Sequence, residues 1–355
     1  MANAVEKLNT IEIGDIEKVN TLDDDAIEDI NTLEFAGVTI PAWAGTRAVY
    51  GGGTQSSNAD LNRIQYKTVG ASANTVDFGD LQTNRSKNSS AGSNQTRGIF
   101  AGGLGLSSGT SGSLVYGVSD TDYITIGSTG NGTDFGDLNF ASSYGQAAGA
   151  SNGTLLFAAG GYGASISGST NAMEYFTIAS TGNGTDAGNI SVTLNGHAAT
   201  NGDTRYIIVA GYNSTTGENI DVLEYNDFST SANCTDFGDT SVTSTYNAAA
   251  ATSIRAVFHI PVGYDGSAYV YGDSLEYVTV ASTGNTSDFG DLDTGRINAV
   301  GLSDGTTGEY SGGNVSGGGS STNIIDGRNL VSTGDASDIG DLLEANQDPG
   351  GLSGS

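Results

Sequence analysis

The chain has 355 residues, of which 55 are glycine, and its 40 acidic and 12 basic side chains give a net charge of −28. This charge argues against nucleic-acid phosphates and anionic membranes as partners, and the single cysteine, Cys234, excludes an intrachain disulfide. The first residues lack a basic region followed by an apolar core, so we expect no signal peptide, and no apolar run approaches the length of a membrane span.

Residues 1–45 follow a rhythm of their own. An eleven-residue unit occurs three times, at residues 5–15, 16–26 and 27–37. Eleven residues over three turns suit a right-handed helical coil, whereas the Asn-Thr pair inside each unit favours a stack of strands and turns, and the sequence leaves both open. Either form has an apolar edge that it cannot bury alone, so we predict an anchor that docks on a partner or on copies of itself. A solvated acidic tail is the alternative.

Residues 38–45 link this segment to the rest of the chain. They contain Pro41 and Trp43, the only tryptophan in the sequence. A fixed proline φ and a large aromatic side chain predict a stiff, packed joint at this point.

Residues 46–355 contain six copies of a unit of about fifty residues, each marked by a DFGD-like segment such as TDFGDL at residues 133–138. The first aspartates of these segments follow one another at intervals of 57, 52, 50, 52 and 50 residues. They are Asp77, Asp134, Asp186, Asp236, Asp288 and Asp338. Repeats of this length indicate an array of similar supersecondary units.

Each unit is typical of four short strands. In the third unit, a small-residue strand precedes an apolar strand at residues 154–161, an alternating strand at 171–180 and the DFGD-like strand. Four antiparallel strands in each of six units predict an all-β, six-bladed β-propeller. Small residues suit the crowded centre of such a ring, and the aromatic residues of the fourth strand are expected to wedge between blades. These aromatic residues are Phe78, Phe135, Phe237 and Phe289.

The two ends of the repeat region complement each other. The first unit begins at its second strand, at Thr46, and has no first strand of its own. Residues 349–355 align with the first-strand position of the other units. We therefore predict that the C-terminal strand completes the first blade, which closes the ring and avoids an open sheet edge.

The repeat region resembles two known groups of proteins. A glycine pair after an apolar strand, as in TRGIFAGG at residues 96–103, resembles kelch-type propellers, although the tryptophan usual in each kelch blade is absent. Residues 46–355 more closely resemble the repeats of structural proteins from marine tailed phages, cyanophages especially, with near-identical strings at residues 96–103, 179–183 and 281–285. The eleven-residue units also resemble those at the start of such fibre and tail proteins. The resemblance implies a place in the virion.

The DFGD carboxylates are the most regular candidate site, with pairs at Asp77/Asp80, Asp134/Asp137, Asp236/Asp239, Asp288/Asp291 and Asp338/Asp341. They suit a ring of calcium sites, the capping of turns, or ion pairs with the arginines that recur in the second strand. These arginines are Arg47, Arg97, Arg205 and Arg255. Repetition favours an architectural role, since a catalytic centre is normally unique. We predict no resident metal or other cofactor and keep calcium as the alternative.

The rare side chains suggest no catalytic centre. A copper oxidase would need histidine and tyrosine ligands with a cysteine beside a tyrosine, and the candidates are His197, His259 and Cys234. The two histidines fall in different strands of different units, so we expect ordinary packing. No GxSxG-type elbow in a strand–helix setting is present.

The loops between the second and third strands differ from unit to unit, at residues 103–113, 161–169, 211–219, 262–273 and 314–323. Their tyrosine, serine, glycine and asparagine content is typical of adaptable binding surfaces. Tyr162, Tyr212, Tyr264 and Tyr269 are the contact candidates, and plain solvated loops are the alternative. In a propeller these loops share one face, and the chain from the anchor reaches the opposite face.

These patterns together predict a non-enzymatic phage virion protein. Residues 1–37 anchor it to other virion proteins, as a homo-oligomer or in many copies, and an outward propeller contacts the host surface or another virion protein. Tail fibre, appendage and decoration protein all fit. The alternative is a carbohydrate-binding, lectin-like propeller. A glycan-active enzyme is the third class and needs a unique acid pair at the ring axis.

Overall fold

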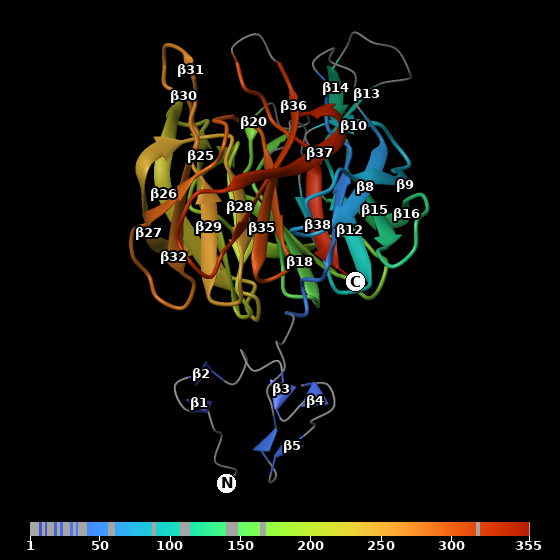
Figure 1. The fold of residues 1–355 in the computed structure, drawn as a ribbon. Helices are drawn as coiled ribbons and strands as arrows, with labels where there is room; N and C mark the ends of the chain where they lie inside the picture. Colours follow the sequence, from blue (N-terminus) through green and yellow to red (C-terminus); the bar gives the residue numbers. More distant parts are fainter. Residues whose placement is uncertain are drawn as a thin grey trace. The chain divides into compact units, whose positions relative to one another are not determined.

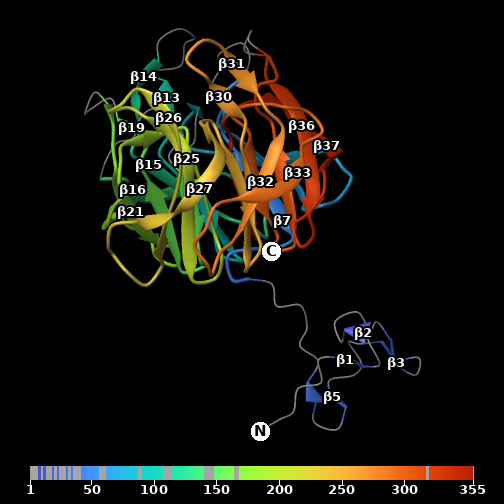
Figure 2. The ribbon, with the colours of Figure 1, turned by 90° about the vertical axis from the view of Figure 1, so that its left-hand side faces the viewer.

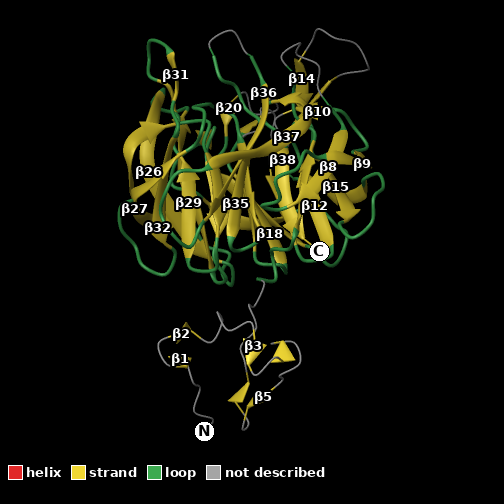
Figure 3. Ribbon diagram, in the orientation of Figure 1, coloured by secondary structure: helices red, strands yellow, loops and turns green. Residues whose placement is uncertain are grey.

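The computed structural model describes residues 41–55, 61–86, 90–106, 114–139, 148–163, 168–316 and 320–354, together with six two-residue strands before residue 41. Strands and loops, without a helix, make up these described residues (Figure 3). The described chain therefore offers no helix that could cross a membrane. Contacts between Cα atoms divide the chain into Met1–Ile40 and Pro41–Ser355.

Each eleven-residue repeat in the first of these units contains one antiparallel pair of two-residue strands. The pairs are β1 (Lys7–Leu8) with β2 (Ile11–Glu12), β3 (Lys18–Val19) with β4 (Leu22–Asp23), and β5 (Asp29–Ile30) with β6 (Leu33–Glu34). The sequence left a helical coil and a stack of strands and turns open, and these strand pairs match the stack of strands and turns.

The second unit is a ring of six antiparallel sheets, which confirms the predicted six-bladed β-propeller (Figures 1 and 2). Each blade has four core strands, which are named in order from the axis outward. Blade 1 has β38 (Gly350–Gly354), β7 (Arg47–Gly51), β8 (Arg63–Thr68) and β9 (Val76–Asp80); blade 2 has β11 (Ser90–Ser93), β12 (Arg97–Ala101), β15 (Asp120–Thr125) and β16 (Thr133–Asp137); blade 3 has β17 (Ala148–Ser151), β18 (Leu155–Ala159), β21 (Ala172–Thr177) and β22 (Thr185–Asn189). Blade 4 has β24 (Ala198–Asn201), β25 (Arg205–Asn213), β26 (Glu218–Asp227) and β27 (Thr235–Ser244); blade 5 has β28 (Ala248–Ala251), β29 (Arg255–His259), β32 (Ser274–Thr279) and β33 (Ser287–Asp291); blade 6 has β34 (Val300–Ser303), β35 (Thr307–Ser311), β36 (Thr322–Asn329) and β37 (Ser337–Asn346).

Short additional strands extend the loops between the blades and between their second and third strands. They are β10 (Arg85–Ser86), β13 (Leu104–Leu106), β14 (Leu114–Gly117), β19 (Tyr162–Gly163), β20 (Gly168–Ser169), β23 (Leu194–Asn195), β30 (Val262–Tyr264) and β31 (Tyr269–Tyr271). The loops between second and third strands lie on one side of the ring, which we call the 2–3 loop face (Figure 1). The turns between first and second strands lie on the other side, the 1–2 turn face.

The hydrophobic core is divided among the contacts between blades. Buried apolar side chains form one cluster at each contact from blade 1–2 round to blade 6–1. The predicted wedges occupy these clusters: Phe78 lies between blades 1 and 2, Phe135 between 2 and 3, Phe237 between 4 and 5, and Phe289 between 5 and 6. A blade therefore buries its apolar surface only against its neighbours.

The first strands carry small residues because they approach each other closely around the axis. A Cβ placed on Gly301 of β34 would lie 2.1 Å from the carbonyl oxygen of Ala249 in β28. Any side chain at this position would separate blades 5 and 6.

The C-terminal strand closes the ring as predicted. β38 pairs antiparallel with β7 in five registered pairs, from Gly350 with Gly51 to Gly354 with Arg47. Leu352 at its centre is 3% exposed and packs with apolar residues of blades 1 and 2. The last strand of the chain is thus the innermost strand of the first blade.

The described part of the link, residues 41–45, is packed on the 1–2 turn face, and residues 38–40 of the predicted joint lie outside the described residues. Trp43 is 8% exposed and packs with Ala251 of blade 5. Its indole nitrogen donates to Asp203 Oδ1 of blade 4 at 3.4 Å, and its carbonyl accepts from Ser93 Oγ of blade 2 at 3.2 Å. Contacts with three blades place this side chain at the axis, opposite the 2–3 loop face.

Replacing Leu352 by alanine should destabilise the propeller by about 3 kcal/mol, because it opens a cavity in the strand that closes the ring. Leu343→Ala is the matched control, since Leu343 is 45% exposed and should change stability by less than about 0.5 kcal/mol. Urea unfolding followed by circular dichroism measures both. Equal losses in the two variants would contradict the closing role of Leu352.

Candidate functional site

The DFGD-like segments lie in the outermost strand of each blade and join it to the next blade. In all six blades the fourth residue of the DFGD motif, such as Asp137, donates its backbone N–H to a side-chain oxygen in a turn of the following blade. These hydrogen bonds are 3.1–3.2 Å long. The bond from Asp341 to Asn74 carries the pattern from blade 6 back to blade 1. The preceding glycine is required: Gly136 has φ +140°, and a Cβ there would lie 2.4 Å from the carbonyl oxygen of Gly182.

The first aspartates of these segments point to solvent. Asp77, Asp134, Asp236, Asp288 and Asp338 are all exposed. Asp338 accepts the N–H of the residue two positions on at 2.9 Å, as Asp186 does, which matches the turn-capping interpretation. Among the described residues, no group of three or more histidine, cysteine, aspartate or glutamate side chains is arranged to hold a metal ion.

The recurring arginines also join neighbouring blades, but without the DFGD carboxylates. Each guanidinium lies 4.5–4.7 Å from the centre of a tyrosine ring in its own blade. Each also donates to a backbone carbonyl of the following blade: Arg47 to Ile126, Arg97 to Ile178, Arg205 to Ala281 and Arg255 to Leu330. Within the described chain no ion pair joins one of these arginines to a DFGD aspartate, so the proposed Asp–Arg bridge is wrong there.

A buried acid or amide in the third strand is the contact between blades that the sequence reasoning missed. These side chains are at most 4% exposed: Gln65, Asp122, Glu174, Glu224, Glu276 and Asp326. In five blades a side-chain oxygen of this residue accepts a hydrogen bond of 2.8–3.1 Å from a backbone N–H of the preceding blade. The donor lies just after the fourth strand or the DFGD segment of that blade. Ser241, for example, donates to Glu276. The signal was present in the sequence, because an acid or glutamine precedes the strand tyrosine in five of the six units.

Two of these residues are aspartates, and each is completed by an arginine. Arg85 lies 2.7 Å from Asp122, and Arg296 lies 2.8 Å from Asp326, with all four side chains buried. Burial is the largest influence: it lowers the pKa of the arginines and raises the pKa of the aspartates, and the partner charge opposes both shifts. Removing either partner would leave an uncompensated buried charge.

The contact between blades 6 and 1 has a polar cluster of its own. Glu309 of β35 accepts hydrogen bonds from Lys67 Nζ at 3.1 Å, from the Gly70 N–H at 2.7 Å and from the Tyr50 hydroxyl. Glu309 and Lys67 are both buried, and burial together with Glu309 raises the pKa of Tyr50 well above its usual value. These bonds tie the last blade to the first.

Serine hydroxyl groups of blades 1, 2, 3 and 6 bond from one blade to the next around the axis near the 1–2 turn face. The serines at the end of the first strands donate to the carbonyl oxygen of the equivalent residue in the preceding blade. Ser353 donates to Ser303, Ser93 to Ser353 and Ser151 to Ser93 over 2.5–3.0 Å, and Ser303 donates to Ala251.

Backbone groups of blades 4, 5, 6 and 1 bond from one blade to the next beside the axis at the 2–3 loop face, and we call this described part of the chain the collar. Gly196, Tyr246, Asn298 and Asp348 each lie two residues before a first strand and have φ between +54° and +67°. Tyr246 N–H donates to Gly196 O, Asn298 N–H to Tyr246 O and Asp348 N–H to Asn298 O, over 2.6–3.3 Å. The left-handed conformation lets each residue bond around the ring instead of along its own strand.

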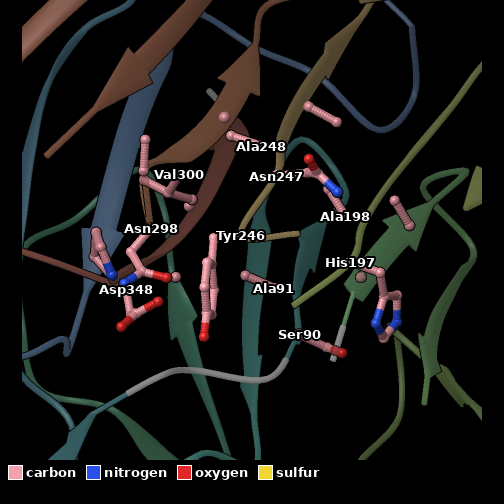
Figure 4. A pocket seen from close by; sticks show the side chains of 18 of the residues that line it. Ser90, Ala91, His197, Ala198, Tyr246, Asn247, Ala248, Asn298, Val300 and Asp348 are labelled. Atoms are coloured by element: carbon pink, nitrogen blue, oxygen red, sulfur yellow. The ribbon is translucent and has the colours of Figure 1, made fainter. Parts of the chain in front are cut away.

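The collar side chains line a cavity of about 110 Å³ at the mouth of the central channel (Figure 4). Tyr246 stands between Asp348 and Asn298 on one side and Asn247 and His197 on the other. The cavity is far smaller than the roughly 300–1,000 Å³ of a pocket that encloses a whole ligand. The described residues that line it include one carboxylate, Asp348, and no lysine or arginine.

The structure brings two of the four predicted contact tyrosines together. Tyr264 and Tyr269 are 43% and 48% exposed, face each other across the β30–β31 hairpin, and have ring centres 5.3 Å apart. Tyr212 is half-buried on β25. Tyr162 belongs to β19, and its side chain lies outside the described part of the structure.

Tyr246 and Tyr271, which were not among the predicted contact residues, join this pair. Tyr269 lies 6.1 Å from Tyr246 and 6.5 Å from Tyr271, measured between ring centres. Tyr246 precedes a first strand and is not in a variable loop, so its place in the sequence gave no hint of this contact. We call Tyr246, Tyr264, Tyr269 and Tyr271 the tyrosine platform.

The two histidines and the cysteine do not form a common site, and their roles are structural. His197 donates from Nε2 to the carbonyl of Ala159 at 2.9 Å, and His259 to that of Gly272 at 3.0 Å. Burial lowers their pKa values to about 4 and about 3, so both rings are neutral at pH 7. Burial also raises the pKa of Cys234 to about 12, which leaves an unreactive thiol.

Comparison with known proteins gives this chain no family. A scan against protein-family models and a search of the curated proteins both found no match. The functional assignment therefore depends on the geometry of the described residues and on the resemblance in the sequence.

Gly136→Ala should lower stability by roughly 2 kcal/mol, because it combines a strained φ with a collision against the next blade. Gly130→Ala is the control, since a Cβ there meets nothing within 4 Å. Thermal unfolding of both variants measures the difference. A Gly136→Ala protein as stable as Gly130→Ala would contradict the role of the DFGD glycine as a contact between blades.

Acid should destabilise the fold through the buried histidines. The pKa of His197 is lower in the folded chain, about 4, than its ordinary value of 6.5, so the unfolded chain binds more protons as pH falls below 6.5. By pH 5 this difference costs about 2 kcal/mol. In His197→Gln, whose amide can still donate to Ala159, the loss of unfolding free energy between pH 7 and pH 5 should be smaller by that amount. An unchanged pH dependence would contradict the burial of a neutral His197.

Proposed function

We propose that this protein is a non-catalytic component of a tailed-phage particle. Residues 1–37 attach it to other virion proteins, and the 2–3 loop face of the propeller contacts the host surface or a further virion protein. The resemblance of residues 46–355 to structural proteins of marine tailed phages supports the setting. The structure contributes the fold and the placement of the side chains.

The main support for this proposal is that repeated and unrepeated polar residues have different roles in the structure. The repeated arginines, buried acids and DFGD segments are used in bonds from one blade to the next. The unrepeated tyrosine platform stands on the opposite face from the link at Trp43. A scaffold whose repeated groups are committed to its own architecture, with one distinctive exposed surface, supports a binding role.

A carbohydrate-binding, lectin-like propeller is the second candidate, and it uses the same surface. Exposed tyrosine rings beside a carboxylate and amides favour it. A glycan-active enzyme has less support, because hydrolysis of a glycosidic bond usually takes two carboxyl groups about 5–9.5 Å apart. Asp348 is the one carboxylate among the described residues of the channel mouth.

Deleting residues 1–37 tests the anchor. The shortened protein should keep the circular dichroism spectrum and melting temperature of the propeller and should be missing from purified phage particles, as measured by mass spectrometry. The full-length chain is the control. Truncated protein found in particles at the full-length level would contradict the anchor.

A further inference from the structure

The tyrosine platform is an aromatic surface with two exposed members, Tyr264 and Tyr269, and the bonds between blades described above use none of its side chains. Its hairpin strands β30 and β31 pair in the order Val262 with Tyr271, Gly263 with Val270 and Tyr264 with Tyr269. Alternation along β31 places Tyr269 and Tyr271 on one side of the hairpin and Val270 on the other. The rings therefore gather on the side from which Tyr246 reaches them.

The platform is held in place by its neighbours. Asn219 of blade 4 donates from Nδ2 to the carbonyl oxygens of Tyr264 at 2.6 Å and Val262 at 3.2 Å. A Cβ on Gly263, which has φ +75°, would lie 3.2 Å from the Tyr246 ring, so the hairpin base packs directly on the collar. Rings that are fixed before a ligand arrives cost little conformational entropy on binding.

Hydrogen-bonding groups lie beside the rings. The collar places Asp348 and Asn298 next to Tyr246 in the cavity at the channel mouth (Figure 4). Burial, and then Tyr269 and Asp348, raise the pKa of Tyr246. The hydroxyl is protonated at neutral pH, as in an ordinary tyrosine, and a hydroxyl, an amide and a carboxylate thus lie at one edge of the aromatic surface.

The charge around the site disfavours an anionic ligand. The hairpin carries Asp265 and Asp273, and no lysine or arginine occurs in residues 262–273 or among the described residues that line the cavity. Arg296 binds the hairpin base only through its backbone N–H, which donates to Gly272. Its guanidinium is fully buried and paired with Asp326.

The ring spacing disfavours an organic cation. An aromatic cage holds an ammonium group between its rings, but the platform rings have centres only 5.3–6.5 Å apart and pack on one another. These neighbouring pairs leave no room for a ligand between their rings, and Tyr264 and Tyr269 are the exposed members that a ligand can reach. The site therefore suits a flat, partly apolar and uncharged ligand with many hydroxyl groups.

We infer that the tyrosine platform binds an uncharged saccharide, with a sugar ring stacked on Tyr264 and Tyr269 and its hydroxyl groups bonded to Asp348, Asn298 and Tyr246. This inference depends on the proposed function, in which the 2–3 loop face is the contact surface. The small cavity takes only the edge of the sugar, and the rest of a glycan chain lies across the hairpin.

Binding of the full-length protein to an array of oligosaccharides tests the inference. The array carries uncharged chains of glucose, galactose, mannose and N-acetylglucosamine, and matched chains that end in a uronic or sialic acid. We expect binding to uncharged chains and roughly tenfold weaker binding to their acidic counterparts. Tyr264→Ala and Tyr269→Ala should each weaken binding by about tenfold or more, and Tyr269→Phe should retain it because the ring remains.

Two further variants sharpen the test. Val270→Ala is the matched control on the same hairpin and should bind as the wild type does. Asp348→Asn keeps a residue that accepts the left-handed backbone and removes the charge, so it should narrow the difference between uncharged and acidic chains. Unchanged melting temperatures of the tyrosine variants establish that they are folded.

The outcomes separate this inference from the proposed function. Binding to acidic chains alone, or binding that survives Tyr264→Ala and Tyr269→Ala, overturns the saccharide site. The saccharide site is also overturned if the protein binds no saccharide but the tyrosine variants lose adsorption to host cells. That result would point to a protein partner on the same face. No saccharide binding, with adsorption and binding to other virion proteins both unchanged in the tyrosine variants, overturns both the site and the contact face.

Discussion

A four-stranded blade with two apolar faces cannot bury them by itself, and the whole structure depends on how each blade meets the next. Apolar clusters fill these contacts, but apolar packing alone does not fix a register. The register comes from directional bonds at several radii: hydroxyls and backbone groups near the axis, a buried acid in the third strand, and the DFGD segment at the rim. Because these groups are buried or shared by two blades, a shifted blade would leave several of them unsatisfied at once.

The repeat is broken where the ring closes, and there unique residues replace repeated ones. The first blade takes its inner strand from the other end of the chain. Glu309, Lys67 and Tyr50 add a buried cluster between blades 6 and 1. Trp43 binds three blades at the axis. Closure thus joins residues that are far apart in sequence, so it carries a cost in chain entropy.

The sequence was sufficient for the fold because the spacing of about fifty residues counts the blades and the missing first strand reveals the closure. The sequence was insufficient to predict which groups the individual side chains contact. An arginine and an aspartate that both recur in the repeat suggest an ion pair from the sequence alone. In the structure, Arg97 donates a hydrogen bond to a carbonyl of the next blade, whereas Asp134 faces solvent. The collar escaped notice because its function is carried by a backbone conformation, so its residues differ in type. Tyr246 belongs to that collar, and only the three-dimensional structure brings it to the hairpin tyrosines.

With the repeated polar groups committed to the ring, the tyrosine platform is the feature that distinguishes the 2–3 loop face among the residues that the structure describes. Native-state hydrogen exchange tests the central claim that bonds between blades hold the ring as one cooperative body. We expect the amides of Asp239 and Ser241, which donate across blades, to exchange as slowly as those of strand β29 and to open with them as denaturant is raised. Exchange of these two amides at the rate of exposed loops, while β29 stays protected, would contradict it.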